Sequence, residues 1–352
     1  MRLSIAKKIF IQAINHSFTF DYDNDKSKKP ISLHLEGSMG IGKTALCRQV
    51  AEEMGLHLVI VSLAQFEPTD IGGLRMPDGD TMKVLRPDWI VTEEEWQELK
   101  AQGYKGILYV FDELPQAPVL NMNIYAQICD EYRVGEYHID RSHCYIMSCG
   151  NKLSDKAGTN AMPSHLVDRL SFLEIEANLD DTCSYFAKTG VDHRIISWLR
   201  FQPEFLHQFQ KGVNAYPTPR SHERVATMLK WELDEEAMSE AISGQIGASA
   251  YANLKTHMDI HEKCPDIDKL IADPMNTPVV EDPPIMFALC SALSMRANDK
   301  NMGSILQYVQ RLPNEEFQAY FLKDALSRDE TLKQNKDVRL WAGKSGNGKY
   351  LV

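Results

Sequence analysis

One stretch near the N-terminus, Gly37-Ser-Met-Gly-Ile-Gly-Lys43-Thr44, constrains the fold of this chain more than any other. It fills every position of the pattern G-x-x-x-x-G-K-[ST]. The apolar run 31–35 before it predicts a short strand, and residues 45–54 after it predict a helix that ends at Gly55. Glycines let successive backbone N–H groups face a phosphate, and the N-terminus of the following helix adds partial positive charge. A chance glycine-rich turn would not require the flanking strand and helix, so the stretch predicts a binding site for a nucleoside triphosphate.

The residue types in this loop suggest separate roles. Lys43 is expected to reach the β- and γ-phosphates of ATP, and the hydroxyl of Thr44 is expected to hold Mg²⁺. The residues expected to cradle these cofactors are Gly37, Ser38, Met39, Gly40, Ile41, Gly42, Lys43 and Thr44. A similar spacing recurs at 343–349, but Tyr350 follows it in place of Ser or Thr, and only two more residues remain. That stretch predicts a flexible polar tail and not a second site.

Composition limits the class of protein. The 352 residues suffice for two or three compact units with buried cores. Hydrophobic content of 43% and charged content of 25% are ordinary for a soluble globular protein, and no segment approaches the ~20 apolar residues of a membrane span. Seven scattered cysteines predict reduced thiols and a cytoplasmic location, and residues 1–14 predict an amphipathic helix rather than a signal peptide. The net charge of −11 argues against a surface that coats nucleic acid, although it does not exclude a local basic pore.

Apolar strands alternate with helical segments in the first half of the chain. A helix is predicted at 119–132, where apolar residues recur at a spacing of four. Strands are predicted at 56–63, 106–111, 143–149 and 170–175. This alternation predicts an α/β fold: a parallel sheet sandwiched by helices, with ligands at the carboxyl ends of the strands.

From about residue 180 the strand pattern stops and helical patterns take over. Helices are predicted first at 182–187, 194–201, 203–210 and 221–233. A proline-interrupted region then predicts helices at 284–295, 302–311 and 315–327. The expected division is an N-terminal helix and charged linker (1–30), an α/β nucleotide-binding domain (31–179), an all-helical lid (180–264) and a helical C-terminal extension with a flexible tail (265–352).

Two carboxylates follow the apolar strand 106–111. Asp112 is expected to orient a water bound to Mg²⁺, and Glu113 is expected to polarise the attacking water. The alternative is an ordinary strand followed by a solvated acidic turn. Beside a phosphate loop, the catalytic interpretation is the stronger one.

Three further polar residues stand at element ends. Asn151 follows the strand 143–149 and has an amide that both donates and accepts hydrogen bonds, as positioning a water requires. Arg169 lies directly before the strand 170–175, and Arg220 follows Pro219 at the start of a predicted helix. A guanidinium suits a γ-phosphate. Taken singly, Asn151 is better explained as a turn residue, and each arginine as a surface or ion-pair residue.

The order of these motifs resembles that of an AAA+ ATPase. Details are similar to the MoxR branch: Pro68-Thr-Asp70-Ile-Gly72-Gly73 follows the second strand, and Asp112-Glu113-Leu-Pro-Gln-Ala117 stands where relatives carry an Asp-Glu-Ile-Asn-Arg-Ala-like run. The resemblance covers roughly residues 31–230. It departs at 114–116, where an Asn-Arg pair is often found, so a role carried by that pair is not transferred.

The resemblance implies a ring, usually of six subunits, with ATP between neighbours. It implies that Asn151 is the first sensor and Arg220 the second sensor, both acting on their own subunit's nucleotide. It implies that Arg169 is an arginine finger that reaches the next subunit, which is worth about 10³–10⁵ in rate. Arg133 and Arg141 are rival finger candidates, but neither stands directly before the last strand.

Three functions fit a chain with these motifs. The leading hypothesis is a chaperone-like ATPase that remodels a protein partner, and the resemblance implies a von Willebrand factor A-type protein as that partner. The second is a nucleic-acid-dependent motor or loader, which the acidic net charge and the lack of a basic, aromatic stripe disfavour. The third is a phosphate-loop kinase, which would not account for Asn151, Arg169 and Arg220 in this order.

Two other features were open to a functional interpretation. His257, His261 and Cys264 recur at helical spacing, but Pro265 follows directly and no fourth zinc ligand is evident, so they predict a solvated helix face. Residues 92–102 predict a short inserted helix with Trp96. It would face a pore or a partner, although such a helix more often packs on the sheet.

Overall fold

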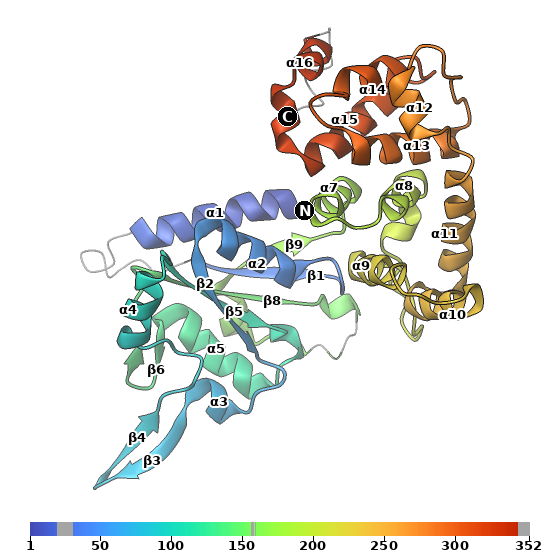
Figure 1. Cartoon of the computed structure of the whole chain (residues 1–352). Helices are drawn as coiled ribbons and strands as arrows, with labels where there is room; N and C mark the ends of the chain where they lie inside the picture. Colours follow the sequence, from blue (N-terminus) through green and yellow to red (C-terminus); the bar gives the residue numbers. More distant parts are fainter. Residues whose placement is uncertain (20–30, 156–157, 159, 344–352) are drawn as a thin grey trace. The chain divides into compact units, whose positions relative to one another are not determined.

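The computed structural model describes residues 1–19, 31–155, 158 and 160–343, which divide into two compact units, Met1–Glu176 and Ala177–Val352 (Figure 1). The charged linker expected at 21–29 and the tail expected at the C-terminus, from residue 344 onwards, lie outside the described residues.

The first unit is built around a five-stranded parallel sheet in the order β2-β5-β8-β1-β9. Its strands are β1 (Ser32–Gly37), β2 (Leu56–Ser62), β5 (Gly106–Asp112), β8 (Cys144–Gly150) and β9 (Leu170–Ile175). The central strand β8 is buried along its whole length, as expected where both faces of a parallel sheet are covered. The predicted α/β sheet is confirmed, and the strand ends differ from the predicted ones by one or two residues.

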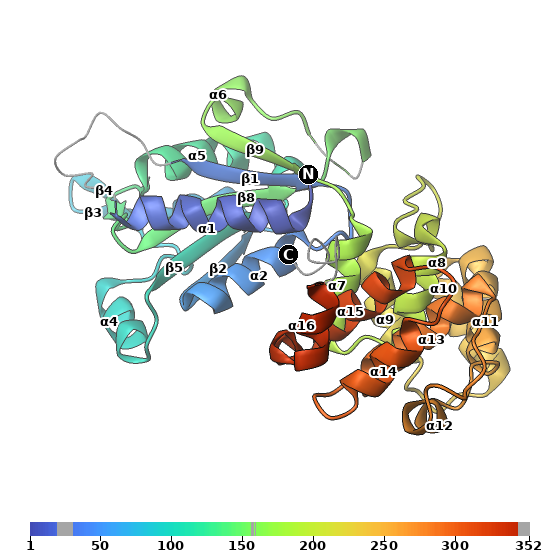
Figure 2. The ribbon, with the colours of Figure 1, turned by 90° about the horizontal axis from the view of Figure 1, so that it is seen from above.

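Helices cover both faces of this sheet (Figures 1 and 2). The longest are α1 (Leu3–Thr19), α2 (Lys43–Met54) and α5 (Val119–Glu131). On one face Cys47 of α2 places its Sγ 3.8 Å from the Sδ of Met147 in β8. On the other face the ring of Tyr125 in α5 lies 4.8 Å from the ring of Phe111 in β5. The phosphate loop, between β1 and α2, is therefore held by a strand and a helix that are both packed into the core.

Shorter elements complete the first unit. They are α3 (Pro68–Gly72), α4 (Glu93–Ala101), α6 (Ser164–Val167), two 3₁₀ turns (Leu114–Gln116 and Leu153–Asp155) and two antiparallel hairpins, β3–β4 (Leu74–Asp78 and Thr81–Leu85) and β6–β7 (Arg133–Val134 and Tyr137–His138). The predicted helix at 92–102 is confirmed: Thr92 caps α4, and Trp96 stacks on His143 at 4.3 Å, so α4 packs beside the sheet. The β3–β4 hairpin was not predicted.

The described part of the second unit consists of helices and turns. The helices are α7 (Leu179–Thr189), α8 (His193–Phe201), α9 (Pro219–Met228), α10 (Glu235–Ile246), α11 (Ala248–His261), α12 (Ile267–Ala272), α13 (Pro283–Arg296), α14 (Met302–Val309), α15 (Glu316–Arg328) and α16 (Lys336–Ala342). One apolar cluster surrounds Trp198 and a second surrounds Trp341. Among the described helices of the whole chain, none combines the length and apolar character needed to cross a membrane.

Two predictions for the second unit were wrong in detail. The helix predicted at 203–210 is only a 3₁₀ turn, Pro203–Leu206, because the chain leaves it in extended conformation at His207. The solvated face predicted around His257 is buried, because α11 packs on α8. The Oγ of Ser197 lies 2.7 Å from Nε2 of His257 and 2.8 Å from Nε2 of His261. Among the described residues, no group of three or more His, Cys, Asp and Glu side chains could hold a metal ion.

Candidate functional site

The phosphate loop has the backbone geometry that its glycines predict. Gly37 ends β1, and a Cβ at this position would lie 2.7 Å from the carbonyl oxygen of Ile175, so a larger residue does not fit. Gly42 adopts φ of 100°, a left-handed conformation that suits glycine. It precedes α2 without a side chain to cap it, which leaves the first N–H groups of the helix for an anion.

Lys43 and Asn151 meet beside this loop. The Nζ of Lys43, which is 8% exposed, donates to the carbonyl oxygens of Gly37 (2.7 Å) and Ser38 (2.9 Å) and to Oδ1 of Asn151 (2.9 Å). Asn151 directly follows β8, and β8 pairs with β1, which leads into the loop. Neighbouring parallel strands therefore bring the amide and the ammonium to the same edge of the sheet.

Thr44 and Asp112 form a second contact at this edge. The Oγ1 of Thr44 donates to Oδ2 of Asp112 at 2.8 Å, although the two residues are far apart in the sequence. Hydroxyl and carboxylate oxygens are the donors that Mg²⁺ takes in proteins, usually with several waters and the phosphates of a nucleotide. The two residues predicted to serve a metal ion thus fit Mg²⁺ by donor type and by proximity.

The other oxygen of Asp112 is also held. Oδ1 accepts from the backbone N–H of Glu113 at 2.8 Å and from the Sγ of Cys149 at 3.0 Å. A hydrogen bond with Cys47, together with burial and the nearby Asp112 carboxylate, raises the pKa of the Cys149 thiol well above its usual range. The thiol therefore stays protonated and donates. Cys149 is not among the site residues predicted from the sequence.

Glu113 is held in an unusual backbone conformation. Its φ of 59° is left-handed, which is uncommon for a residue with a side chain and is often found at functional sites. The Oγ of Ser62 donates to its Oε2 at 2.9 Å. Ser62 ends β2 and is the register partner of Asp112 in β5. Ser62 is not among the site residues predicted from the sequence, because a serine at the end of an apolar strand becomes informative only once β2 is known to pair with β5.

Arg169 lies at the opposite edge of the sheet from the phosphate loop. It directly precedes Leu170, which pairs with Ser32 at the start of β1, whereas the loop follows Gly37 at the end of β1. Five residue steps along a strand separate the two edges by roughly 17 Å. The exposed Arg169 guanidinium instead donates to Oδ2 of Asp130 at 3.2 Å and to the carbonyl oxygen of His165. It is not part of its own subunit's phosphate site.

The two rival finger candidates lie near Arg169. Arg141 donates to the carbonyl oxygen of Asp130 at 3.1 Å, and its guanidinium lies 5.1 Å from the centre of the Tyr132 ring. Arg133 pairs with Glu131 at 2.9 Å. All three arginines therefore gather around the C-terminal end of α5. The sequence did not reveal this cluster.

Arg220 belongs to the second unit. It is the second residue of α9, after Pro219, and Thr218 caps that helix by accepting from the N–H of Ser221. The Arg220 side chain is exposed. Its expected action on the nucleotide stays a prediction.

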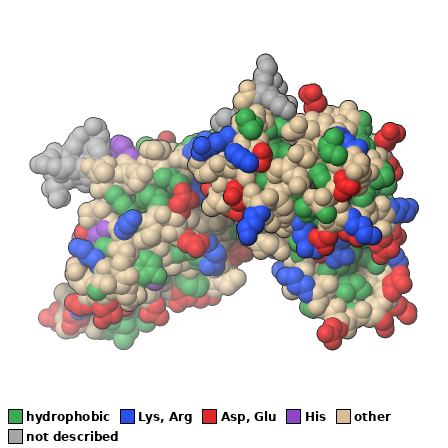
Figure 3. Space-filling model, turned by 45° about the horizontal axis from the view of Figure 1, so that its top comes forward, with side chains coloured by type: hydrophobic (Ala, Val, Ile, Leu, Met, Phe, Trp, Pro, Cys, Tyr) green, Lys and Arg blue, Asp and Glu red, His purple; other side chains and the backbone are tan. Residues whose placement is uncertain are grey.

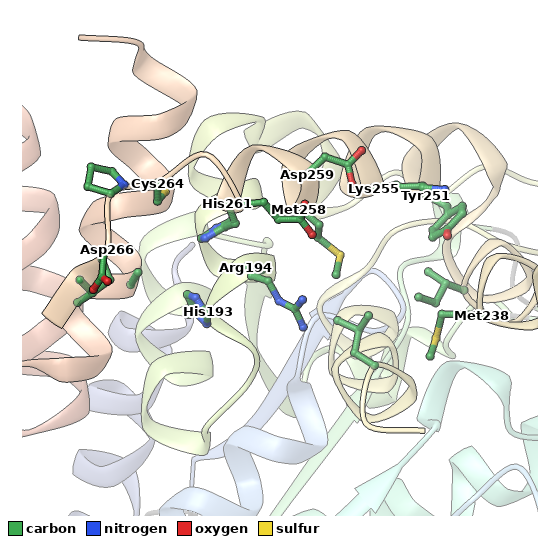
Figure 4. A pocket seen from close by; sticks show the side chains of 16 residues that line it. His193, Arg194, Met238, Tyr251, Lys255, Met258, Asp259, His261, Cys264 and Asp266 are labelled. Carbon is green, nitrogen blue, oxygen red and sulfur yellow. The ribbon is translucent and has the colours of Figure 1, made fainter. Parts of the chain in front are cut away.

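A cavity of about 550 Å³ lies within the second unit, among α8, α10, α11 and α13 (Figure 4). His193 and His261 turn toward each other there, with ring centres 5.1 Å apart. Its charged lining is mixed, with Arg194 and Lys255 beside Asp259, Glu262 and Asp266. His261 and Cys264, which were considered as zinc ligands and rejected, line this cavity, but none of the residues predicted for the nucleotide site does. Its charges favour no one class of ligand.

Comparison with known proteins relates one segment to a family. Residues 33–94 match the model described as ATPase family associated with various cellular activities (AAA). The match contains the phosphate loop and ends before Asp112. No curated protein sequence matches the chain.

Solved structures with a similar arrangement share little sequence. Two RuvB mutants from Thermotoga maritima are 13% and 14% identical; in both the match covers 82% of this chain, with 81% and 80% of theirs and TM-scores of 0.39 and 0.38. A closed-state reconstruction of Hsp104 with ATPγS and casein is 15% identical, covering 71% of this chain and 46% of that chain with a TM-score of 0.35. Three observations that do not depend on these structures indicate the same fold: the phosphate loop between β1 and α2, the strand order, and the match to the AAA family model. The fold is that of an AAA+ ATPase domain followed by a helical part.

Proposed function

We propose that this chain is a Mg²⁺-dependent AAA+ ATPase of the MoxR type that works as a ring and remodels or activates a protein partner. One observation carries the proposal. Lys43, Thr44, Asp112, Glu113 and Asn151 come from three separate segments, and hydrogen bonds or direct sequence adjacency join them at the carboxyl edge of one parallel sheet.

Each of these residues has a role that its contacts support. Lys43 and the loop N–H groups bind the phosphates, and Thr44 with Asp112 would hold Mg²⁺, which supplies charge neutralisation at the phosphates. Glu113 accepts the proton of the attacking water, with Ser62 holding its carboxylate. Asn151 already hydrogen bonds Lys43 and orients that water. Arg220 acts as a second sensor of the same nucleotide.

The position of Arg169 supports assembly into a ring. Because it lies at the amino edge of the sheet, it cannot contact the phosphates bound by its own loop. In a head-to-tail ring the amino edge of one subunit can meet the carboxyl edge of the next. We therefore assign Arg169 as the finger that acts on the neighbour's γ-phosphate, and we expect a hexamer.

Sequence features suggest the type of partner and the cellular location. The segment Pro68–Gly72 forms α3, and Asp112 and Glu113 precede a 3₁₀ turn, at the two places where the sequence is similar to the MoxR branch. That similarity supports a protein client and a von Willebrand factor A-type partner. The described cysteines are all free thiols, which supports a cytoplasmic location.

A nucleic-acid motor is the alternative. On the face shown in Figure 3, Lys and Arg side chains are interspersed with Asp and Glu, as the net charge of −11 leads one to expect. Weak, salt-sensitive binding is all that such a surface supports. Strong, saturable stimulation of hydrolysis by DNA or RNA at physiological salt would replace the proposal with this alternative.

The substitution Glu113→Gln tests the proposed reaction. The amide cannot accept the proton, so turnover should fall by about 10²–10⁴, the usual worth of a general base. ATP binding should persist, because Glu113 contacts Ser62 and not the loop. Phosphate release and equilibrium binding of a fluorescent ATP analogue measure the two properties. Wild-type turnover in the Gln variant would show that Glu113 is not the base.

A further inference from the structure

Cys149 is placed to act on the metal side of the candidate site. It is the sixth residue of β8, is 0% exposed, and pairs in register with Leu35 of β1. Its Sγ lies 3.0 Å from Oδ1 of Asp112, a distance short enough for a thiol to donate. The contact joins β8 to the end of β5, two strands that also share backbone hydrogen bonds.

The donors around Asp112 divide between its two oxygens. Oδ2 faces Thr44, the residue assigned to Mg²⁺. Oδ1 faces away from that contact and accepts from two donors, the N–H of Glu113 and the thiol of Cys149. Two donors on one oxygen fix the plane of the carboxylate, and so fix the direction of the other oxygen. Without the thiol, the carboxylate keeps the N–H of Glu113 on Oδ1 and the hydroxyl of Thr44 on Oδ2, and its orientation is held less firmly.

We propose that Cys149 is a positioning residue that holds the Asp112 carboxylate in the orientation that binds Mg²⁺ beside Thr44. The inference rests on the proposed function, because it assumes that Asp112 and Thr44 serve the metal ion of a bound nucleotide. It adds a residue that neither the phosphate loop nor the Asp112-Glu113 pair includes. Partners that orient metal ligands are typically worth 10- to 100-fold in metal affinity.

The test is the gain in nucleotide affinity that Mg²⁺ provides. Binding of N-methylanthraniloyl-ADP is measured by fluorescence with Mg²⁺ and with excess EDTA. The ratio of the dissociation constant in EDTA to the dissociation constant with Mg²⁺ is then compared between variants. In Cys149→Ala the ratio should fall by about tenfold, the low end of that range, because a thiol is a weak donor. The affinity in EDTA should stay at the wild-type value. Cys149→Ser, which keeps a donor, should retain most of the ratio.

Two further variants separate positioning from packing. Cys144→Ala removes a buried thiol at the other end of the same strand and should leave the ratio unchanged. Cys149→Val removes the donor and leaves no cavity; it should behave as Cys149→Ala does, and it replaces that variant if Ala does not fold. Thermal unfolding of each variant is recorded alongside.

The outcomes are distinct. A wild-type ratio in Cys149→Ala or Cys149→Val overturns the inference, and so does an equal loss of affinity with and without Mg²⁺, because that pattern indicates packing alone. A wild-type chain that binds no nucleotide contradicts the proposed function itself. A reduced ratio in Ala and Val, with Ser retained, supports the positioning role.

Discussion

We propose that phosphate binding depends on the Lys43 side chain. Its ammonium group is buried at the loop and already makes three hydrogen bonds to oxygen acceptors, so little rearrangement is needed when phosphate oxygens replace them. Lys43→Ala should weaken ATP binding by about 10- to 100-fold, since hydrogen bonds to charged groups are worth about 1.5–3 kcal/mol each. Isothermal titration with ATP measures the loss. The exposed Lys211→Ala serves as a control that should bind normally. Unchanged affinity in Lys43→Ala would remove the lysine from the site.

Ser62 should affect turnover and not binding. Its hydroxyl holds the Glu113 carboxylate at the end of β2, on the side of β5 away from β8. Ser62→Ala leaves the carboxylate with one fewer donor and more rotational freedom, so kcat should fall by about tenfold or less, the worth of one neutral hydrogen bond. The KM for ATP should not change. Steady-state kinetics separate the two constants, and a rise in KM with an unchanged kcat would contradict this role.

At the scale of elements, helix α11 carries a pH-sensitive contact. Burial lowers the pKa of His257 to about 4, and burial together with His193 and His257 lowers that of His261 to about 3. Both stay neutral in the fold, while the unfolded chain takes up protons below about pH 6.5. Stability is therefore full above that pH and is lost as the pH falls from 6.5 toward 4, by up to about 1.4 kcal/mol per pH unit for each histidine.

The variant His257→Gln tests this dependence. Gln can still hydrogen bond to Ser197 but does not titrate, so the slope of stability against pH between 6.5 and 5 should decrease by about one proton's worth. Urea unfolding followed by tryptophan fluorescence gives the slope. His138→Gln, at an exposed position in β7, should leave it unchanged. An unaltered slope in His257→Gln would mean that His257 is protonated in the fold.

The sheet was predictable from sequence because its strands are continuous apolar runs, as in Gly106–Asp112. The β3–β4 hairpin was not, because its two five-residue strands are exposed almost throughout and form no continuous apolar run. The helix predicted from residue 203 was too long because the sequence has no stop signal before His207. The burial of His257 was not predicted because its partner, Ser197, lies in another helix.

The candidate site also contains residues that the sequence predicts and residues that it does not. Lys43, Thr44, Asp112 and Glu113 stand in patterns with fixed spacing, and the structure joins them as the motifs led us to expect. Ser62 and Cys149 have no pattern of their own. They contact the acidic pair only through the order of strands, in which β2 and β8 flank β5. Strand order is set by tertiary packing, which a single sequence does not state.

At the scale of the whole molecule, the proposed site needs residues from two opposite edges of one sheet. The carboxyl edge carries the phosphate loop and the acidic pair, and the amino edge carries Arg169 with Arg133 and Arg141 nearby. A site that needs both edges cannot be completed within one subunit. Specific activity should therefore rise with protein concentration as rings form.

Mixing two inactive variants tests this account most directly. Arg169→Ala should keep its nucleotide affinity but lose turnover by about 10³-fold or more, as expected for an arginine finger, and Lys43→Ala should not bind ATP tightly. In a random one-to-one mixed ring, about a quarter of the interfaces pair an intact loop with an intact finger. The account predicts that hydrolysis recovers toward that fraction of the wild-type rate. No recovery, in rings shown to contain both variants, would contradict the assignment of Arg169 to the neighbour's site.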